Sequence, residues 1–546
     1  MTHTQIEQQT KELIDNLKAT CASYGLGNDG NEYKIITQIF LYKFLNDKFG
    51  YEVKRVSKRK YSDRLSKAEK WDAEIQKFTD VEYDDLLTYL PAHTPALKKE
   101  HLVSQVWNQQ GKGDFSTFFD ATMVAIGNEN ADIFSVKTSK GSSDRLFEAI
   151  TIYVTDVDQR DAFARSLISR LVEFNFEPVF AQKYDFFSTI FEYLIKDYNK
   201  DGGGKYAEYY TPHAVATIMA QLLVKEGEEV QNVTCYDPSA GSGTLLMAIA
   251  HAIGEDRCTI YSQDLNQKSS KMLRLNLILN NLVHSIPNVI QGDTLTTPFH
   301  KDSRGSLKKF DYIVSNPPFK LDFSDTRDSL EGDARFFAGI PTIPPKKKDS
   351  MAIYLCFIQH IMYSLSNKGK AAIVVPTGFL TASSGIEKKI REEIIKRKML
   401  RGVVSMPSNI FATTSTNVSI LFLDKQNIED TAVLIDASKL GEKVKEGRNQ
   451  KTKLDKKDVD LIVRHYHHKE NLKDFSVVVK YEDMDEKDYS FSAGQYFEIQ
   501  IELQNISKEE YITRINAYTS SLDKLFNESR ILEAKLRQQL DELKYE

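Results

Sequence analysis

Two short segments of the sequence contain residues whose types and spacing could do chemistry. The first is YDPSAGSGTLL, residues 236–246, in which Gly241 and Gly243 permit a tight turn and a close approach of a ligand to the backbone. The second is FDYIVSNPPFK, residues 310–320, which offers an amide, two prolines and an aromatic ring directly after a short apolar run. The first segment is suited to holding a nucleoside-like cofactor, and the second to holding a flat polar substrate.

The glycine segment does not fit the two common phosphate-binding loops. A P-loop requires a lysine at the start of the helix, and a dinucleotide fingerprint requires a third glycine where this chain has Leu246. Two glycines alone are most simply a structural turn. Nearby carboxylates favour a ligand site, because Asp237 ends the strand and Asp264 stands where an acidic residue accepts hydrogen bonds from ribose hydroxyls. Asp293, after the third predicted strand, is a third carboxylate or a turn former.

The Asn-Pro-Pro sequence has a structural explanation and a chemical one. Proline ends strands and often marks turns, so these residues could simply terminate the strand. The same loop could also hold a planar molecule that carries an exocyclic amine. The amine would donate to the side-chain carbonyl of Asn316 and the main-chain carbonyl of Pro317, while Phe319 stacks on the ring. Prolines stiffen the loop, and stiffness preserves alignment.

Alternating apolar runs and helices predict the sheet that would bring these two loops together. Strands are expected at 233–237, 258–264, 287–291, 310–315, 370–375, 400–405 and 417–423, with helices at 242–254, 266–283, 350–366 and 385–398. Such alternation is typical of an α/β fold with a doubly wound, mostly parallel sheet, here of seven strands. If the first and fourth strands flank the point where the strand order reverses, both loops meet at the carboxyl edge, where ligands bind such sheets.

Two further segments lie next to the predicted site. TPHAVATIMAQLLVKEG, residues 211–227, predicts a helix with Thr211 at the N-cap and Pro212 at the first helical position. Residues 320–350 are polar and irregular, which is typical of a lid or a binding loop. We expect this segment to be mobile in the free protein and ordered when the substrate is bound.

The sequence divides into three regions. Residues 1–175 show helical periodicity and predict an N-terminal helical domain, 176–430 contain the alternating pattern, and 431–546 form a C-terminal extension. In the extension, a capping box at Ser507 and Glu510 opens a predicted helix over 507–543. Its heptad seam, which requires a partner helix, consists of Tyr511, Ile515, Tyr518, Leu522, Leu525, Leu532, Leu536 and Leu543.

Composition and charge narrow the class of protein. The chain has 546 residues, 41% of them hydrophobic and 27% charged, which predicts a folded protein of two or three domains. Neither a membrane span nor a signal peptide is expected, and the four cysteines lack metal-ligand spacing, so that a cytoplasmic location without structural zinc is favoured. The net charge is −5, and basic residues are confined to local stretches such as 54–70 and 346–348. Any contact with nucleic acid is therefore expected to need a partner.

In their order and spacing, the motifs resemble those of amino-methyltransferases that use S-adenosylmethionine. DPSAGSGT (237–244) followed by NPPF (316–319) is the pattern of that class. AEYYTPHAV (207–215) looks like the cofactor-binding segment that precedes the glycine turn in one class of adenine DNA methyltransferases, although those usually have Phe at one of the two tyrosines. Three more segments extend the resemblance to the methyltransferase (M) subunit of type I restriction-modification systems: NEYKIITQIFLYKFL (31–45), NIFATTSTNVSILFLDK (409–425) and YSFSAGQYF (489–497).

The resemblance implies roles for particular residues. Those expected to line an S-adenosylmethionine site are Glu208, Tyr209, Tyr210, Thr211, Pro212, Asp237, Ser239, Gly241, Ser242, Gly243, Thr244, Asp264 and Asp293. Asn316, Pro317, Pro318 and Phe319 would hold a target adenine that has been flipped out of DNA, and would carry the catalysis. The resemblance implies no metal and no general base.

The resemblance also implies partners. These are DNA and a specificity (S) subunit embraced by two M subunits, with no membrane contact. The sequence leaves open whether a restriction (R) subunit joins them. Two alternatives remain. RNA guanine and the glutamine amide of a protein are also methylated by enzymes with an Asn-Pro-Pro-aromatic loop, but those enzymes are typically smaller. A scaffold that binds the cofactor only as a sensor would not need Asn316 and Phe319.

Overall fold

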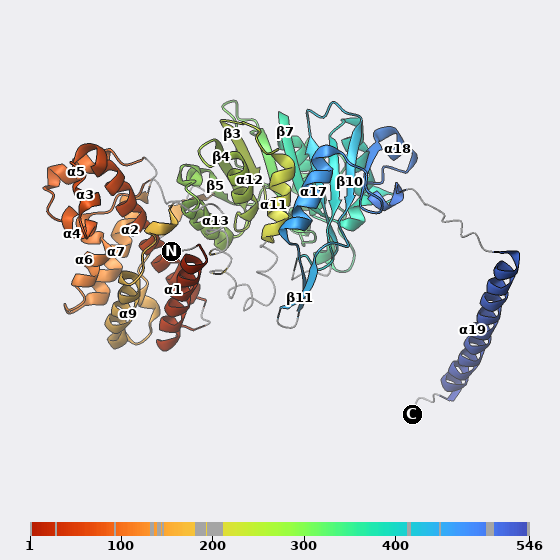
Figure 1. Cartoon of the computed structure of the whole chain (residues 1–546), viewed down its shortest axis with the longest axis horizontal. Coiled ribbons are helices and arrows are strands. Elements are labelled where there is room, and N and C mark those ends of the chain that lie inside the picture. The colour runs from red at the N-terminus through yellow and green to blue at the C-terminus, as the bar shows by residue number, and fades with distance from the viewer. Residues whose placement is uncertain are drawn as a thin grey trace. The chain divides into compact units, whose positions relative to one another are not determined.

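A sheet built from the middle of the chain dominates the fold, as Figure 1 shows. The computed structural model describes residues 3–27, 30–91, 94–131, 136–138, 143–144, 147–180, 190, 193, 211–411, 416–446, 449–497 and 507–542. Within these residues the sheet has 11 strands, in the order β13-β10-β8-β9-β7-β6-β3-β4-β5-β1-β2. Contacts between residues divide the chain into two units, Met1–Phe497 and Glu498–Glu546.

The seven strands predicted from apolar runs are all present and lie together in the middle of the sheet. They are β3 (Val233–Asp237), β4 (Cys258–Asp264), β5 (Val289–Gln291), β6 (Phe310–Ser315), β7 (Leu365–Pro376), β8 (Leu400–Ser405) and β9 (Val418–Asp424). β9 is antiparallel to both of its neighbours, whereas β3, β4, β5, β6 and β7 are parallel. The predicted mostly parallel α/β sheet is therefore confirmed.

The sheet is wider than the seven strands that the sequence predicts. β10 (Thr431–Asp436) pairs in parallel with β8, and β13 (Ser476–Lys480) pairs antiparallel with β10. At the other edge, β1 (Val136–Thr138) pairs with β5 and with β2 (Ser143–Asp144), two strands too short to show a sequence period. The sheet thus continues past residue 430, where we expected its domain to end, and the division into three domains stays a prediction.

Helices cover both faces of the sheet, which explains why its strands read as near-continuous apolar runs. Successive residues of β7 point to opposite faces, so that Ala372 and Val374 join one core while Ile373 and Val375 join another. Helices on the first side are α11 (His213–Leu223), α12 (Thr244–Ile253), α13 (Gln267–Leu279) and α17 (Lys456–His468). Those on the second side are α15 (Tyr354–Ser364), α16 (Gly385–Lys396) and α18 (Tyr481–Glu486).

The N-terminal region is built mainly from helices in the part that the structure describes. These are α1 (His3–Ser23), α2 (Glu32–Lys60), α3 (Arg64–Lys67), α4 (Trp71–Ile75), α5 (Asp80–Thr88), α6 (Val103–Asn108), α7 (Phe115–Glu129) and α9 (Arg160–Val172). The apolar face of α2 is buried, including Ile35, Ile39 and Phe44. A helical period in the sequence therefore identified the central helix of this region.

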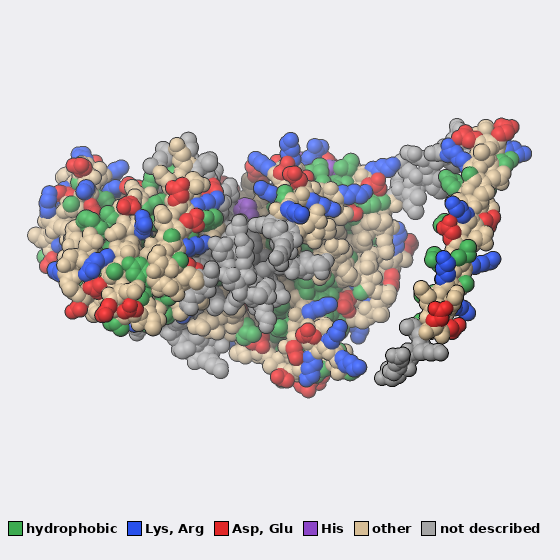
Figure 2. Space-filling model, turned by 90° about the horizontal axis from the view of Figure 1, so that it is seen from below, with side chains coloured by type: hydrophobic (Ala, Val, Ile, Leu, Met, Phe, Trp, Pro, Cys, Tyr) green, Lys and Arg blue, Asp and Glu red, His purple; other side chains and the backbone are tan. Residues whose placement is uncertain are grey.

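The C-terminal unit contains α19 (Lys508–Glu542), which begins where the capping box predicts. The Ser507 hydroxyl accepts a hydrogen bond from the Glu510 N–H at 3.1 Å. No described residue of the helix is buried, and Leu522, Leu525 and Leu532 of the heptad seam are all more than half exposed. Figure 2 shows hydrophobic side chains among the charged ones along this helix. The described residues of the predicted seam are therefore not covered by any part of the C-terminal unit itself.

Arg391 on α16 fastens the end of the first unit to the sheet. Its buried guanidinium donates to the main-chain carbonyls of Tyr489, Phe379 and Ala382. The N–H of buried Phe491 donates to the Leu380 carbonyl at 2.9 Å. Residues 489–491 are thus held against the turn that follows β7.

Replacing this arginine should destabilise the protein. Arg391→Leu removes the donor from one buried and two partly buried carbonyls, so we expect the free energy of unfolding to fall by about 3 kcal/mol in urea denaturation. Arg397→Leu is the matched control, because Arg397 forms an exposed pair with Glu393 on the same helix and should change stability by less than about 1 kcal/mol. Equal losses in the two variants would contradict this assignment.

Candidate cofactor and substrate site

The strand order reverses at β3, and this reversal creates the candidate site. β3 pairs in parallel with β4 on one side and with β6 on the other, so that the first and fourth predicted strands flank the reversal as expected. The loops after these strands are in contact, because the hydroxyls of Ser239 and Ser315 lie 2.7 Å apart. Ser315 also donates to the carboxylate of Asp237 at 3.1 Å. The structure therefore brings the glycine loop and the Asn-Pro-Pro loop to one edge.

The glycine loop has the tight turn that its sequence indicates. Gly241 and Gly243 have φ angles of 53° and 83°, and a Cβ atom on Gly243 would lie 2.1 Å from Leu273 Cδ1. Gly243 is the N-cap of α12, and no side chain caps this helix. Since the first N–H groups of a helix have no partner within it, the start of α12 can donate to an anionic group of a ligand.

Asp264 has a role that the sequence did not reveal. One oxygen accepts a hydrogen bond from the Gly241 N–H and the other from the Asn266 N–H, both at 2.8 Å. The carboxylate thus fastens the glycine turn to the end of β4. Each oxygen keeps a further lone pair, so that the expected acceptance of ribose hydroxyls is still possible. Burial raises the pKa of Asp264, while the two hydrogen bonds lower it.

Asp237 is the most deeply buried carboxyl of the site, with 1% of its surface exposed. Burial raises its pKa to about 7, and the nearby charge of Asp264 acts in the same direction. Hydrogen bonds from the Ser239 N–H and the Ser315 hydroxyl oppose this rise. Asp237 and the partly buried Asp264, whose charge raises the pKa of Asp237, form an environment that favours a positively charged ligand.

Thr211 does not cap a helix, and this expectation from the sequence was wrong. α11 begins at His213, because Pro212 already has an extended backbone with ψ 139° and is itself the N-cap. The buried hydroxyl of Thr211 instead accepts a hydrogen bond from Asn316 Nδ2 at 3.2 Å. This contact joins the segment before α11 to the Asn-Pro-Pro loop, and no local sequence pattern could have indicated it.

The Asn316 amide is oriented by this contact. Because its NH₂ group is directed at Thr211, its carbonyl oxygen Oδ1 faces the other way, and no described residue donates to it. Phe319 packs edge-on against Tyr354, with ring centroids 6.3 Å apart, and is only partly buried. Pro317 is buried, whereas Pro318 is exposed. The loop therefore presents one free acceptor and part of an aromatic ring.

Asp293 acts as a turn former, one of the two roles that its sequence left open. It accepts hydrogen bonds from the N–H groups of Leu295 at 2.8 Å and Thr296 at 3.4 Å. The neighbouring Thr294 hydroxyl donates to the Pro238 carbonyl at 2.7 Å, which ties this turn to the glycine loop.

Of the other predicted residues, Ser242 and Thr244 lie at the glycine turn and the start of α12, with their hydroxyls 3.1 Å apart. Glu208, Tyr209 and Tyr210 lie outside the described residues.

Part of the predicted lid is packed against the site. Buried Arg335 donates to the carbonyls of Thr294 and Leu295, and its neighbour Phe336 lies in a small apolar cluster with Phe323. This part includes α14 (Ser324–Arg327). Lys346, Lys347 and Lys348, by contrast, are exposed. Whether residues 320–350 become ordered with substrate stays a prediction, which now concerns mainly the exposed lysine stretch.

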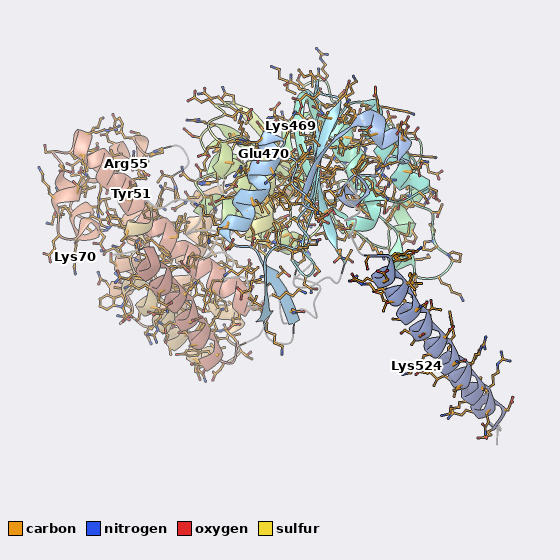
Figure 3. All side chains as sticks on the ribbon, turned by 45° about the vertical axis from the view of Figure 1, so that its right-hand side comes forward. Tyr51, Arg55, Lys70, Lys469, Glu470 and Lys524 are labelled. Atoms are coloured by element: carbon orange, nitrogen blue, oxygen red, sulfur yellow. The ribbon has the colours of Figure 1, made fainter. Side chains whose placement is uncertain are left out.

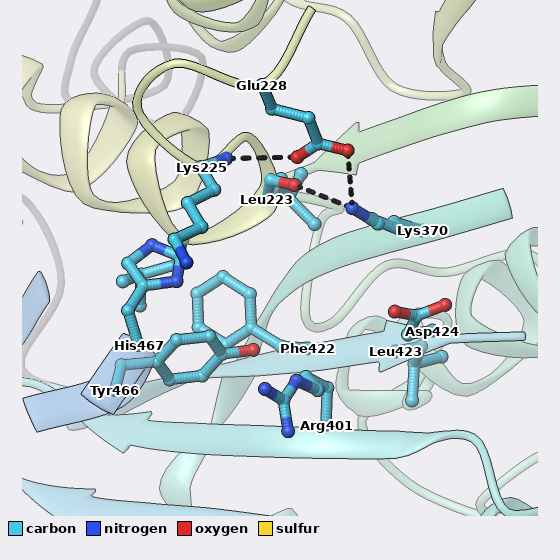
Figure 4. Close-up of a pocket in the computed structure, with 11 residues that line it drawn as sticks. Leu223, Lys225, Glu228, Lys370, Arg401, Phe422, Leu423, Asp424, Tyr466 and His467 are labelled. Atoms are coloured by element: carbon cyan, nitrogen blue, oxygen red, sulfur yellow. Dashed lines mark hydrogen bonds and ion pairs between the residues drawn. The ribbon is translucent and has the colours of Figure 1, made fainter. Parts of the chain in front are cut away.

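A cavity of about 220 Å³ lies away from these loops, at the opposite ends of the strands (Figure 4). Its lining includes Lys370 early in β7, Arg401 at the start of β8 and Asp424 at the end of antiparallel β9. Glu228 accepts a hydrogen bond from Lys370 Nζ at 3.4 Å and so balances part of the positive charge. The cavity therefore does not belong to the candidate site.

The basic stretch 54–70 is partly neutralised. Lys54 pairs with Glu177 and Arg64 with Glu74, each at 2.6 Å. Arg55 lies over the ring of Tyr51, and Figure 3 labels both on α2.

Among the described residues, no group of three or more His, Cys, Asp or Glu side chains could hold a metal ion. No described helix is long and apolar enough to cross a membrane.

Comparison with known proteins agrees with this geometry. Residues 182–505, more than half of the chain, match the model of the N-6 DNA methylase family, and the chain belongs to this family. The type I restriction enzyme MpnII methylase subunit of Mycoplasma pneumoniae is 29% identical over 368 residues, which cover 66% of this chain and 64% of that protein. The HindI methylase subunit of Haemophilus influenzae is 25% identical over 382 residues, 68% of this chain and 82% of that protein.

A crystal structure shares the fold. The methyltransferase subunit of a type I restriction-modification system from Streptococcus thermophilus has a TM-score of 0.70 at 21% identity, covering 90% of this chain and 100% of that chain. The methyltransferase fold predicted from the sequence is thus confirmed, as is the resemblance to type I modification subunits. The chain spans less than two thirds of the length of the Mycoplasma relative.

The raised pKa of Asp237 predicts a pH-dependent stability in the ligand-free protein. An unfolded aspartate has a pKa of about 3.9, so between pH 4 and 7 the folded state keeps a proton that the unfolded state has lost. Its stabilising contribution is complete below pH 4 and is lost as the pH rises to 7. In the variant Asp237→Asn, the side-chain oxygen can still accept the hydrogen bonds from Ser239 and Ser315, but the side chain cannot ionise.

Urea denaturation of both proteins at several pH values tests this prediction. Relative to the asparagine variant, wild-type stability should fall by up to about 4 kcal/mol between pH 4 and 7, and the difference should be constant above pH 8. A difference that does not change between pH 4 and 7 would show that Asp237 ionises normally.

Proposed function

We propose that this chain transfers a methyl group from S-adenosylmethionine to the N6 amine of adenine in DNA, as the modification subunit of a type I restriction-modification complex. The observation that carries the proposal is the oriented amide of Asn316, whose Oδ1 is left free while its Nδ2 donates to Thr211. Membership of the N-6 DNA methylase family and the names of the relatives support the same substrate.

The residues around the glycine turn suit this cofactor. The open N-terminus of α12 would bind the cofactor's carboxylate, and Asp264 would accept hydrogen bonds from its ribose. Buried Asp237 and partly buried Asp264 fit a ligand that carries positive charge at its sulfonium and ammonium groups, since such a ligand favours their ionised forms. When bound, the cofactor supplies an electrophilic methyl group.

The Asn-Pro-Pro loop would prepare the amine for attack. The lone pair of the N6 amine is delocalised into the adenine ring, which makes it a poor nucleophile. If Asn316 Oδ1 and the Pro317 carbonyl accept its two hydrogens, the nitrogen becomes more pyramidal and its lone pair can face the methyl group. A nitrogen–carbon bond then forms as the sulfur–carbon bond breaks, and the proton on nitrogen is released to solvent.

The target base must leave the duplex, because its amine is hidden in the stack. The partly exposed ring of Phe319 is placed to stack on the flipped base, a contact worth about 1–3 kcal/mol. The packing of Phe319 against Tyr354 would hold the ring in position. This interaction offsets part of the cost of unstacking the base, which is a few kcal/mol.

We propose the specificity subunit as the partner that selects the DNA sequence, with two modification subunits on each specificity subunit and a restriction subunit as a further component. The exposed heptad seam of α19 supports this arrangement, because such seams are normally covered by another helix. The net charge of −5 supports it as well, since a chain that gripped DNA alone would usually be basic.

Transfer of tritiated methyl from labelled S-adenosylmethionine tests the proposed reaction. The assay compares DNA, RNA and protein as acceptors, with and without the specificity subunit, and the labelled product is digested for identification. Label in N6-methyladenine from DNA is the expected result. Label in guanine of RNA or in protein glutamine would replace the proposed substrate, and binding of the cofactor without transfer would indicate a sensor.

Asn316→Ala should separate catalysis from cofactor binding. We expect the single-turnover rate of methyl transfer to fall at least about 100-fold, because the acceptor that aligns the amine is lost. Calorimetry should show an affinity for S-adenosylmethionine within a few fold of wild type. Asn427→Ala is the matched control, since the Asn427 amide donates to Leu400 at the other edge of the sheet. Wild-type turnover by Asn316→Ala would refute the assignment.

Substitutions on α19 should separate assembly from cofactor binding. Leu525→Arg combined with Leu532→Arg places two charges on the seam, and co-purification with the specificity subunit should be lost while S-adenosylmethionine binding is retained. Ser520→Arg combined with Asn527→Arg is the control, because these positions lie on the opposite face of the same helix. If the seam variant still assembles and methylates DNA, α19 is not the docking helix.

A further inference from the structure

A basic hairpin extends from the edge of the sheet that carries the candidate site. β10 runs parallel to β8, so that its end at Asp436 lies at the carboxyl edge, as do the ends of β3 and β6. The hairpin follows directly and consists of β11 (Glu442–Glu446) and β12 (Asn449–Lys453). Figure 1 shows β11 extending beyond the sheet. The hairpin adds no strand to the 11-stranded sheet and contributes little to its core.

The base of the hairpin is fixed to the loop after β8. Thr452 is buried, with its hydroxyl donating to the Ser408 carbonyl at 2.6 Å and its N–H to the Asn409 carbonyl at 3.0 Å. Gly441 opens the hairpin with φ 86°, and a Cβ atom there would lie 2.7 Å from the Thr452 methyl group. The hairpin is therefore held in a defined position at this edge.

Lysines lie on both faces of the hairpin. The register pairs Lys443 with Thr452 and Lys445 with Gln450, so that these two lysines share one face. Lys453 lies on the other face, opposite Glu442. The side chains of all three lysines are exposed, and none forms an ion pair with a residue that the structure describes. The hairpin thus carries more lysines than the two glutamates, Glu442 and Glu446, can balance, on a chain whose net charge is negative.

Two further lysines continue this positive charge. Lys456 and Lys457 are exposed in the first turn of α17, directly after the hairpin. Positive charges at the N-terminus of a helix interact unfavourably with the helix dipole, and each lowers the stability of the helix by roughly a few tenths of a kcal/mol. The helix dipole therefore does not favour lysines at these positions, which lie between the capping-box residues Asp455 and Asp458.

We propose that the hairpin β11–β12 binds the phosphates of duplex DNA beside the target base. This inference rests on the proposed function, which brings DNA to the same edge of the sheet. A two-stranded ribbon fits the major groove, and lysines on both faces can meet phosphates on both walls. Such contacts position the duplex without reading its sequence, which suits a chain whose sequence specificity comes from another subunit.

The test is the salt dependence of DNA binding by the full-length chain assembled with its specificity subunit. The hairpin variant combines Lys443→Gln, Lys445→Gln and Lys453→Gln, and the probe is a labelled 30-base-pair duplex measured by fluorescence anisotropy. Affinity falls as salt rises, and each lost phosphate contact makes the slope of log affinity against log salt less steep by about 1. We therefore expect the magnitude of the slope to decrease by about 2 to 3 in the hairpin variant. Affinity for S-adenosylmethionine should remain unchanged.

A second triple variant controls for the loss of three charges. Lys368, Lys389 and Lys480 are exposed lysines outside the hairpin, and their replacement by Gln should leave the salt slope within about 1 of wild type. Equal slopes for wild type and the hairpin variant would overturn the inference. Loss of co-purification with the specificity subunit at an unchanged slope would also overturn it, by showing that the hairpin binds protein.

The same preparations distinguish this inference from the proposed function. Tritium transfer to DNA by the wild-type chain with its specificity subunit tests the function itself. If wild type methylates adenine and the hairpin variant keeps its salt slope, only the hairpin inference fails. If wild type transfers no methyl group to DNA, the proposed function fails.

Discussion

The hydrogen bond from Asn316 Nδ2 to Thr211 Oγ1 connects the parts of the site that the fold brings together. Asn316 follows β6, the parallel neighbour of β3 where the strand order reverses, and Thr211 precedes α11. An asparagine amide has a donor end and an acceptor end, so fixing the NH₂ group also fixes the direction of the carbonyl oxygen. A single neutral contact thus determines which end of Asn316 can meet a substrate.

Electrostatic interactions dominate the part of the site around Asp237 and Asp264. Asp237 is buried and Asp264 is partly buried, and the loss of contact with solvent raises the pKa of both carboxyls. In the ligand-free protein the raised pKa of Asp237 lowers stability as the pH rises to 7, and a cation bound beside the carboxyls would offset this loss. The hydrogen bonds that restrain these acids come from the glycine turn and from Ser315, so the groups that would bind the cofactor also shape the loop. Binding of the proposed cofactor and the conformation of the glycine loop would therefore depend on the same two carboxyls.

Local patterns in the sequence predicted the elements of the site but not all of their contacts. The apolar runs of β3, β4 and β6 located the strand ends, and the positions of Asp237 and the Asn-Pro-Pro loop followed from them. The contact of Asp264 with Gly241 and that of Thr211 with Asn316 join distant residues, so no periodicity could indicate them. Strands β1 and β2 are too short for a period, and β10 was assigned to the C-terminal extension although its apolar run is visible.

A double-mutant cycle in single-turnover methyl transfer tests the coupling of Thr211 to Asn316 most directly. Thr211→Val removes the hydroxyl and keeps the shape, and we expect it to slow transfer by roughly 10- to 100-fold with nearly unchanged S-adenosylmethionine affinity. Thr211→Ser should restore most of the rate. In the Asn316→Ala background, Thr211→Val should have no further effect, because the group it orients is absent. Equal slowing in both backgrounds, accompanied by weaker cofactor binding, would show that Thr211 is a cofactor ligand and does not orient the amide.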